Sequence, residues 1–302
     1  MRRAYDRLMH TRTIGNDTTG RVDVGAIGLG LMTFDQTGHQ PREQLLDTVR
    51  AALDAGVTLF DTADAYGPGE ELGADAQGEN EKLIASILDE LGVRDRVFLA
   101  TKGGALRTDG GGWEVDGRPE HMHRAVDASL SRLGVEQISL WQHHRPDPKV
   151  DYAETIGALT EIAASGKVRM IGLSNVDPGQ IRAAHDALGD SLVSVQNQFS
   201  PKFRSSRPEI DVCAELGLAF LPWSPLGGLS DAKELASNHP AFQQVAEARG
   251  VSAQQVALAW ELAQSPVVIP IPGAKRPQSI RDSAAAADLV LSDDELAALD
   301  QG

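Results

Sequence analysis

The sequence contains a single cysteine, Cys213, among its 302 residues. One thiol permits neither an intramolecular disulfide nor a zinc cluster held by cysteines, so the composition favours a reducing compartment and we expect no metal site. Long apolar segments are also lacking. No run of about 18 apolar residues could cross a membrane, and the basic start at residues 1–3 is not followed by the apolar core of a signal peptide. We therefore expect a cytoplasmic protein.

Positive charge is scarce in this chain. Lysine and arginine total 28 against 43 aspartates and glutamates, which gives a formal net charge of −15. Such a chain repels both nucleic acids and anionic membrane surfaces. We expect no partner of either kind and infer a small-molecule substrate; the sequence favours no particular oligomeric state.

A complete dinucleotide-binding fingerprint is missing as well. Gly28 and Gly30 begin like one, but Thr33 occupies the position of the third glycine. No proline- or serine-rich linker divides the chain. With 302 residues, of which 41% are hydrophobic, the chain is long enough for two domains or for one α/β barrel. The two absences make a two-domain, doubly wound fold the weaker interpretation.

The residues that are present repeat a strand-then-helix pattern. Short β-prone runs occupy 24–29, 57–60, 97–101, 138–142, 168–173, 192–195, 219–222 and 267–271. Helices are expected over 40–55, 79–91, 119–133, 152–164, 178–188, 207–216, 242–249 with 253–263, 276–287 and a short final segment at 296–299. The pattern predicts a parallel (β/α)8 TIM-type barrel, one domain over residues 1–302, with a short N-terminal hairpin within 1–22. Residues 103–117 and 227–237 are expected to be loops.

In such a barrel the carboxyl ends of all strands open on one face, where active sites lie. The residues that follow the predicted strands are Met32, Asp61, Tyr66, Lys102, His144, Ser174, Asn175, Gln196, Trp223 and Lys275. The stretch 56–67 is the most informative, because its strand stops at Asp61 and Tyr66 comes five residues later. We expect these side chains to meet at the mouth of the barrel.

Four of the strand-end residues predict acid–base chemistry. A phenol has a pKa near 10; Lys102 beside Tyr66 would lower that pKa, and Asp61 would hold the ammonium in place. A histidine there can donate a hydrogen bond to a substrate carbonyl. His143 and His144 compete for this role, because neighbours on a strand point to opposite sides. Such a set suits proton delivery to a carbonyl oxygen, and the accompanying hydride requires a nicotinamide cofactor.

Other strand ends offer a site for that cofactor. The side chains concerned are Ser174, Asn175, Gln196, Trp223, Lys275 and Arg276. The amides and the hydroxyl suit a carboxamide, the indole face suits a stacked ring, and the two cations before a helix start suit a phosphate. Taken singly, each has a structural alternative: Asn175 as a helix cap, Trp223 as a core residue, and the cations as solvated surface charges.

Three aromatic residues are candidate walls of a substrate pocket, namely Phe34, Trp113 and Trp141. A pocket lined by aromatic rings would admit planar aldehydes, pyridoxal among them. Plain packing in the core is the alternative for each of the three.

Seven segments of the chain carry a family resemblance. They are 26–30 (Ala-Ile-Gly-Leu-Gly), 56–67, 100–102 (Ala-Thr-Lys), 142–147 (Gln-His-His-Arg-Pro-Asp), 166–175 (Gly-Lys-Val-Arg-Met-Ile-Gly-Leu-Ser-Asn), 223–227 (Trp-Ser-Pro-Leu-Gly) and 269–274 (Ile-Pro-Ile-Pro-Gly-Ala). With these segments the chain resembles the aldo-keto reductases, NADPH-dependent barrel oxidoreductases, over nearly its whole length.

By position, the resemblance implies a catalytic tetrad and a cofactor site. The tetrad falls on Asp61, Tyr66, Lys102 and His144, the histidine being chosen over His143 by the His-Arg-Pro-Asp run. Cofactor contacts fall on Met32, Ser174, Asn175, Gln196, Trp223, Ser224, Leu226, Gly228, Gly273, Lys275, Ser279, Asp282 and Ser283. Ser279 and Ser283 replace an arginine and an asparagine seen in relatives. A preference for NADPH over NADH therefore rests on Lys275 and Arg276.

The sequence thus predicts an NADPH-dependent enzyme that reduces a small aldehyde or ketone to the alcohol, with Tyr66 as the general acid. Two other classes stay open. One is a nucleotide-binding regulatory barrel with little catalysis, which the intact tetrad disfavours. The other is an aldolase that forms a Schiff base on Lys102, in which Ser174, Asn175 and Trp223 would have no purpose.

Overall fold

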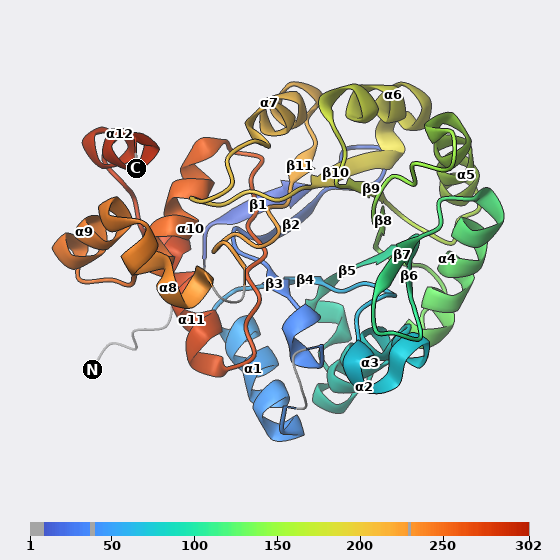
Figure 1. Cartoon of the computed structure of the whole chain (residues 1–302), viewed down its shortest axis with the longest axis horizontal. Helices are drawn as coiled ribbons and strands as arrows, with labels where there is room; N and C mark the ends of the chain where they lie inside the picture. The colour runs from blue at the N-terminus through green and yellow to red at the C-terminus, as the bar shows by residue number, and fades with distance from the viewer. Residues whose placement is uncertain (1–8, 37–39, 229–230, 302) are drawn as a thin grey trace.

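A curled parallel sheet inside a ring of helices forms the body of the computed structural model (Figure 1), which describes residues 9–36, 40–228 and 231–301. The strands are β3 (Leu29–Gly30), β4 (Leu59–Asp61), β5 (Phe98–Gly103), β8 (Leu140–His143), β9 (Ile171–Ser174), β10 (Leu192–Gln196) and β11 (Ala219–Phe220). They follow the order β11-β10-β9-β8-β5-β4-β3, and every pair is parallel. Successive strands lie next to one another, as the alternating sequence pattern predicts.

The expected eighth strand, 267–271, closes the barrel without forming a regular ladder. On one side the N–H groups of Ile269 and Ile271 donate to the carbonyls of Phe220 and Pro222, at 2.8 and 3.2 Å. On the other side the carbonyls of Pro270 and Pro272 accept from Gly28 and Gly30, at 2.8 and 3.0 Å. Proline has no N–H, so these two residues accept bonds from the neighbouring segment but donate none to it. The predicted (β/α)8 barrel is confirmed, with its last strand half-bonded on that side.

Amphipathic helices surround the sheet (Figure 1). They are α1 (Arg42–Asp54), α2 (Gly69–Leu72), α3 (Glu79–Leu91), α4 (Pro119–Leu133), α5 (Tyr152–Ala164), α6 (Pro178–Leu188), α7 (Arg207–Leu216), α8 (Asp231–Asn238), α9 (Pro240–Arg249), α10 (Ala253–Gln264), α11 (Pro277–Ala285) and α12 (Asp293–Gln301). In α3, for example, Ile84, Ile87 and Leu88 recur on one face and are buried. The helix stops at Gly92, whose left-handed conformation (φ 64°) suits a residue without a Cβ.

Short 3-10 turns join several of these elements. They span η1 (Met32–Phe34), η2 (Gly73–Ala76), η3 (Arg94–Arg96), η4 (Gly189–Ser191) and η5 (Ala286–Asp288). Helix α8 begins within 227–237, where a loop was expected, and ends one residue beyond it; residues 229–230 of that segment are outside the described part. The expected strand 24–29 is divided, its first residues belonging to an N-terminal hairpin and its last to β3.

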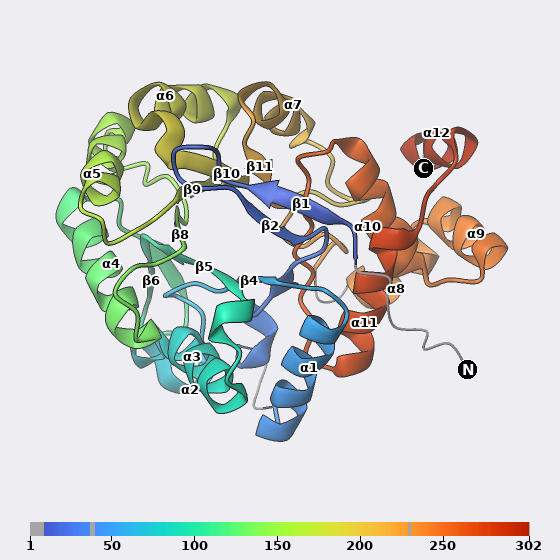
Figure 2. The ribbon, with the colours of Figure 1, turned by 180° about the vertical axis from the view of Figure 1, so that it is seen from behind.

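Two hairpins lie at opposite ends of the barrel. The first, β1 (Thr11–Ile14) with β2 (Val22–Gly25), crosses the end that faces the viewer in Figure 2. Its Ile14 and Val24 are buried against Leu59 and Leu140 of the barrel interior, so it plugs that end. The second, β6 (Ala105–Arg107) with β7 (Trp113–Val115), follows the carboxyl end of β5, inside the segment expected to be a loop. With one end plugged, the strands' carboxyl ends are left for chemistry.

Candidate active site

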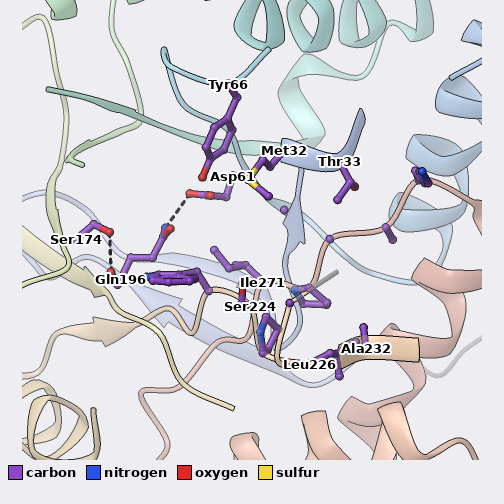
Figure 3. A pocket seen from close by; sticks show the side chains of 18 of the residues that line it. Met32, Thr33, Asp61, Tyr66, Ser174, Gln196, Ser224, Leu226, Ala232 and Ile271 are labelled. Atoms are coloured by element: carbon purple, nitrogen blue, oxygen red, sulfur yellow. Dashed lines mark hydrogen bonds between the residues drawn. The ribbon is translucent and has the colours of Figure 1, made fainter. Parts of the chain in front are cut away.

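A cavity of about 610 Å³ opens at the carboxyl ends of the strands. In Figure 3, Tyr66 and Asp61 lie at one end of it and Leu226 and Ala232 at the other. The predicted site residues in its lining are Met32, Asp61, Tyr66, Trp113, His144, Ser174, Asn175, Gln196, Trp223, Ser224, Leu226, Gly228, Gly273, Lys275, Ser279, Asp282 and Ser283. Residues spread over most of the chain therefore meet in one groove.

Lys102 lies just beneath this cavity, with 1% of its surface exposed. Its Nζ is 2.6 Å from Asp61 Oδ2, 2.8 Å from the Thr62 carbonyl and 3.2 Å from the Tyr66 hydroxyl. An ammonium group has three N–H donors, so these acceptors use all of them. The lysine is thereby fixed, and one of its donors points at the phenol.

The second oxygen of Asp61 is also fully engaged. Asp61 Oδ1 accepts the side-chain amides of Gln142 and Gln196, at 3.0 and 2.9 Å. Gln196 therefore holds the Asp61 carboxylate as well as lining the cavity. Gln142 was missed at the sequence level, although a glutamine inside the apolar run of β8 is a signal: such a group is buried only when hydrogen-bonded.

The pKa of Tyr66 is raised above its ordinary value. Burial is the largest cause and outweighs the opposing effect of Lys102, while Asp61 adds to the rise. The expected net lowering is thus wrong, although the effect of Lys102 has the expected sign. For Lys102 itself, burial works to lower the pKa, but Asp61 and Tyr66 together raise it. Near neutral pH the pair is therefore a neutral phenol beside an ammonium, which is a proton donor with a cation ready to stabilise the phenolate.

The two histidines point to opposite sides, as strand alternation predicts. His144 lines the cavity, and its ring centroid lies 5.8 Å from that of Tyr66. Burial, and after it the charges of Lys102 and Arg145, lower the pKa of His144 well below its usual value. A neutral imidazole retains one N–H donor for a substrate oxygen. His143, by contrast, is fully buried on the outer side of the sheet, beside Gly104 and Met122.

Strand alternation also explains an incorrect expectation. Trp141 is fully buried and packs against Gly103 and Ala125, outside the cavity lining. It lies two residues before His143 in β8 and so shares the outward side. Phe34 is likewise buried in the core, at 1% exposure, and lines no part of this cavity. Of the three aromatic residues proposed as pocket walls, only Trp113 lines the cavity; the expectation for Phe34 and Trp141 is wrong.

Asn175 does not cap helix α6, so that alternative is excluded. The cap is Asp177, which forms a capping box with Gln180. Asn175 instead has a left-handed backbone (φ 58°) and donates its amide to the His144 carbonyl at 3.0 Å and to Ser174 Oγ at 2.9 Å. A strained backbone that is held by such contacts is typical of functional sites. Asn175 thus ties the ends of β8 and β9 together at the cavity.

Trp223 and Ser224 follow β11 at the other side of the groove. Trp223 is only partly buried: it packs against the apolar cluster inside the barrel and also lines the cavity. Ser224 has a positive φ of 48°, the second such non-glycine position in the described chain. The groove is thus lined here by the Trp223 indole and by a sharp backbone turn at Ser224.

The N-terminal end of helix α11 forms the far side of the groove. Lys275 and Arg276 directly precede the helix, and Ser279, Asp282 and Ser283 lie on it. The Asp282 carboxylate accepts from Ser252 Oγ at 2.8 Å and Gln255 Nε2 at 2.6 Å. These two partners on or before α10, which sequence reasoning missed, hold α11 in place. Two cations at a helix start, where the helix dipole favours negative charge, fit a phosphate.

The groove fits a nicotinamide dinucleotide as a whole. Hydroxyl and amide groups lie near Asp61, Tyr66 and His144, a partly exposed indole follows, and a cationic helix start lies beyond. The described residues contain no cluster of histidine, cysteine and acidic side chains that could hold a metal ion. None of the described helices is long and apolar enough to cross a membrane.

Comparison with known proteins gives the class of the molecule. The model of the Aldo/keto reductase family matches residues 26–302. A 6-dehydroglucose reductase from Novosphingobium aromaticivorans is 35% identical over 88% of this chain and 87% of its own. A probable aldo-keto reductase 1 from Glycine max is 32% identical over 91% of this chain and 84% of its own.

Solved structures agree. An aldo-keto reductase from Klebsiella pneumoniae in complex with NADPH superposes with a TM-score of 0.78 at 28% identity, covering 97% of this chain and 95% of its own. The glycerol dehydrogenase AKR11B4 from Gluconobacter oxydans gives a TM-score of 0.80 at 25% identity, covering 99% and 95%. The fold and site define a barrel oxidoreductase, and the chain belongs to the aldo-keto reductase family.

Proposed function

We propose that the protein uses NADPH to reduce a small aldehyde or ketone to the alcohol, with Tyr66 as the general acid. The observation that carries the proposal is the 3.2 Å hydrogen bond from Lys102 Nζ to the Tyr66 hydroxyl, backed by a buried ion pair with Asp61. A neutral phenol held at a cavity by a cation can give its proton to an oxygen that gains negative charge. The phenolate left behind is stabilised by the same ammonium.

The neutral His144 donates a hydrogen bond to the substrate carbonyl and orients it towards Tyr66. Bound NADPH supplies the hydride. Ser174, Asn175 and Gln196 would hold its carboxamide, and Trp223 would offer its indole to the nicotinamide ring. These assignments follow the residues that line the groove, and the NADPH complex of the Klebsiella pneumoniae relative supports the choice of cofactor.

The rest of the dinucleotide is assigned along the groove. The contacts to its pyrophosphate and adenosine are assigned to Met32, Ser224, Leu226, Gly228, Gly273, Ser279, Asp282 and Ser283. Lys275 and Arg276 would hold the 2′-phosphate that distinguishes NADPH from NADH. Because Ser279 supplies no charge, the preference for NADPH depends on these two cations.

A Schiff-base mechanism on Lys102 is less well supported. A Schiff base requires a free amine that a carbonyl can reach, whereas Lys102 is 1% exposed and donates to three acceptors. The raised pKa keeps it protonated and so not nucleophilic.

The rings of Tyr66, Trp113 and His144 suit a planar aldehyde, pyridoxal among them. The 6-dehydroglucose reductase among the relatives adds oxidised hexoses as a second class. We further propose that residues 1–302 form one domain and that the protein acts in the cytoplasm on a small molecule, without a nucleic-acid partner.

The test is NADPH consumption by the purified protein with aromatic aldehydes, pyridoxal, short aliphatic aldehydes and an oxidised hexose. We expect NADPH-fluorescence titration to show binding and at least one class to be reduced. Absence of NADPH binding would sink the proposal. Binding without reduction of any class would favour the regulatory barrel instead.

A further inference from the structure

The β6–β7 hairpin stands over the substrate side of the cavity. Gln77 docks its first strand: Gln77 Nε2 donates to the Ala105 carbonyl at 3.0 Å, and the Arg107 N–H donates to Gln77 Oε1 at 2.9 Å. The second strand begins with Trp113, which lines the cavity. At 42% exposure Trp113 has little packing of its own, so its position requires another support.

That support is Arg107, which is only 7% exposed. Its guanidinium carbon lies 3.8 Å from the centre of a Trp113 ring. A guanidinium that stacks on an indole is attracted by the ring electrons and fixes the plane of the ring. Arg107 also donates from Nη1 to the Gly111 carbonyl at 3.1 Å, which holds the tip of the hairpin.

The same guanidinium donates hydrogen bonds to the backbone on both sides of Tyr66. Its Nε donates to the Ala65 carbonyl at 2.7 Å, and its Nη2 donates to the Gly67 carbonyl at 3.1 Å. Space is reserved for the group, since a Cβ on Gly69 would stand 2.5 Å from Arg107 Nη1. No ion pair with a carboxylate forms at Arg107 within the described residues, so its fork serves carbonyls alone.

The two supported residues meet a third at the cavity. The rings of Tyr66, Trp113 and His144 touch edge to face, with centroid distances of 6.2 Å for Tyr66–Trp113, 5.8 Å for Tyr66–His144 and 6.1 Å for Trp113–His144. A shift of any one ring therefore moves the others. Arg107 contacts the Trp113 ring and the backbone on either side of Tyr66, although it does not line the cavity itself.

We propose that Arg107 is a positioning residue of the reduction. Its guanidinium fixes the distance between the Tyr66 hydroxyl and Lys102 Nζ, and it holds Trp113 in place as one wall of the substrate pocket. This inference rests on the proposed function, because it assigns a role in that reaction. It separates two kinetic effects. The contacts beside Tyr66 govern kcat, and the stack on Trp113 governs KM.

The test uses Arg107→Lys and Arg107→Ala with a reduced aldehyde. A lysine keeps the charge but loses the fork and the flat stacking face. We expect kcat to fall by roughly ten- to a hundredfold, because a displacement of about 1 Å at a reacting group has this effect, and KM to rise. The alkaline limb of the kcat profile should move to higher pH, since a weaker Lys102 contact removes an effect that lowers the Tyr66 pKa. NADPH affinity should stay within about twofold, because Arg107 does not line the groove.

Trp113→Leu separates the two effects. In that background Arg107→Lys should still lower kcat but should no longer change KM, a non-additivity that a double-mutant cycle measures. Guanidinium ion added to Arg107→Ala at millimolar concentration should restore part of kcat, which a purely structural loss would not show.

Arg94 provides the matched control. It donates to the carbonyls of Leu133 at 2.9 Å and Ala85 at 3.3 Å in the helix layer and, unlike Arg107, also pairs with a carboxylate, that of Asp89. Arg94→Ala should lower the urea midpoint without changing kcat, KM or the pH profile. The proposal is overturned if either Arg107 variant keeps kcat and KM within about twofold of the parent, or if its effects match those of Arg94→Ala. If Arg107→Ala does not fold, Arg107→Lys decides alone. Loss of NADPH binding by the parent protein would instead be a failure of the proposed function.

Discussion

Two ion pairs, each with a buried carboxylate, lie on opposite sides of strand β5. Inside the barrel, Lys102 Nζ is 2.6 Å from Asp61 Oδ2; outside it, Arg132 Nε is 2.6 Å from Glu81 Oε2. The outer pair is tied to β5 by Thr101, the neighbour of Lys102, whose hydroxyl donates to Glu81. Adjacent residues of one strand thus serve two pairs, because their side chains alternate between faces.

The pairs have equal lengths and different neighbours. The third acceptor of Lys102 is the Tyr66 hydroxyl, which lines the cavity. Beyond the outer pair, Arg132 donates to no other described residue than Ser129, whose Oγ lies at 3.3 Å within the same helix α4. A buried pair is weak evidence of function or of net stability by itself. What distinguishes the inner pair is the hydrogen bond from Lys102 to Tyr66, which lines the cavity. Variants of each pair can test this difference.

Lys102→Met should have the largest effect, because it acts on both stability and chemistry. It leaves the Asp61 carboxylate buried without a cation, which typically destabilises a protein by about 3–5 kcal/mol. It also removes the cation that stabilises a Tyr66 phenolate. We expect kcat to fall by roughly 10²–10⁴-fold and the urea midpoint to fall with it. A variant that retains near-parental turnover would show that the inner pair is as structural as the outer one.

Tyr66→Phe should affect chemistry far more than stability. The ion pair between Lys102 and Asp61 stays intact, and only one acceptor of the ammonium is lost, so we expect a change in unfolding free energy of about 1 kcal/mol. The loss of the proton donor should lower kcat by roughly 10²–10⁴-fold at unchanged NADPH affinity. Stopped-flow reduction and fluorescence titration measure the two quantities. Equal loss of cofactor binding would contradict the assignment of Tyr66 as the acid.

Arg132→Met should affect stability alone. Glu81 has no exposed surface, so loss of its cation should cost about 3 kcal/mol in urea unfolding. Turnover should stay within about twofold. Adding Glu81→Leu removes the stranded carboxylate and should recover most of the loss. If turnover falls as it does for Lys102→Met, the two faces of β5 are coupled and the comparison fails.

The sequence predicts the barrel well because its signals are repeated in every unit. Each unit has an apolar run, a glycine and an amphipathic helix, as 79–91 and Gly92 illustrate. Signals that occur once were less informative. The hairpin within 103–117 lies in a glycine-rich stretch where its docking partner Gln77 is distant in sequence. The last strand appears as a run of β-prone residues, but Pro270 and Pro272 leave it half-bonded on one side.

At the site, residue types and their places at strand ends indicate which side chains could meet. They do not give the direction of a pKa shift, because that depends on how deeply each group is buried. A lysine beside Tyr66 is visible in sequence, whereas the burial that outweighs its effect on the pKa is a property of the folded chain. Trp141 could have been placed correctly, because it and His143 are two residues apart in one strand and share its outward side. Other contacts join residues of different elements: Gln142 donates to Asp61, and Ser252 and Gln255 donate to Asp282. These partners are far apart in sequence, so no local pattern predicts that they meet.

Glu261 extends the comparison to a buried carboxyl group that has no cation beside it among the described residues. Glu261 in α10 has no exposed surface, and neither of its carboxylate oxygens has a hydrogen-bond partner among the described residues. Burial raises its pKa well above the usual value, so the folded protein binds a proton that the unfolded chain has released. Stability should therefore be full below the unfolded-state pKa of about 4.3 and decline as pH rises through the folded-state pKa.

Glu261→Met removes this group and should raise the unfolding free energy by about 1–3 kcal/mol at mildly alkaline pH, and by less at pH near 4. Urea unfolding of parent and variant at the two pH values measures the difference. Glu261→Gln isolates the charge from the packing, since it keeps the shape and cannot ionise. Among the described residues, Asp61 and Glu81 have cations and Glu261 has none. A pH-independent gain would mean that Glu261 does not change its protonation on unfolding, and a loss at both pH values would mean that an unpartnered buried carboxyl costs this fold nothing.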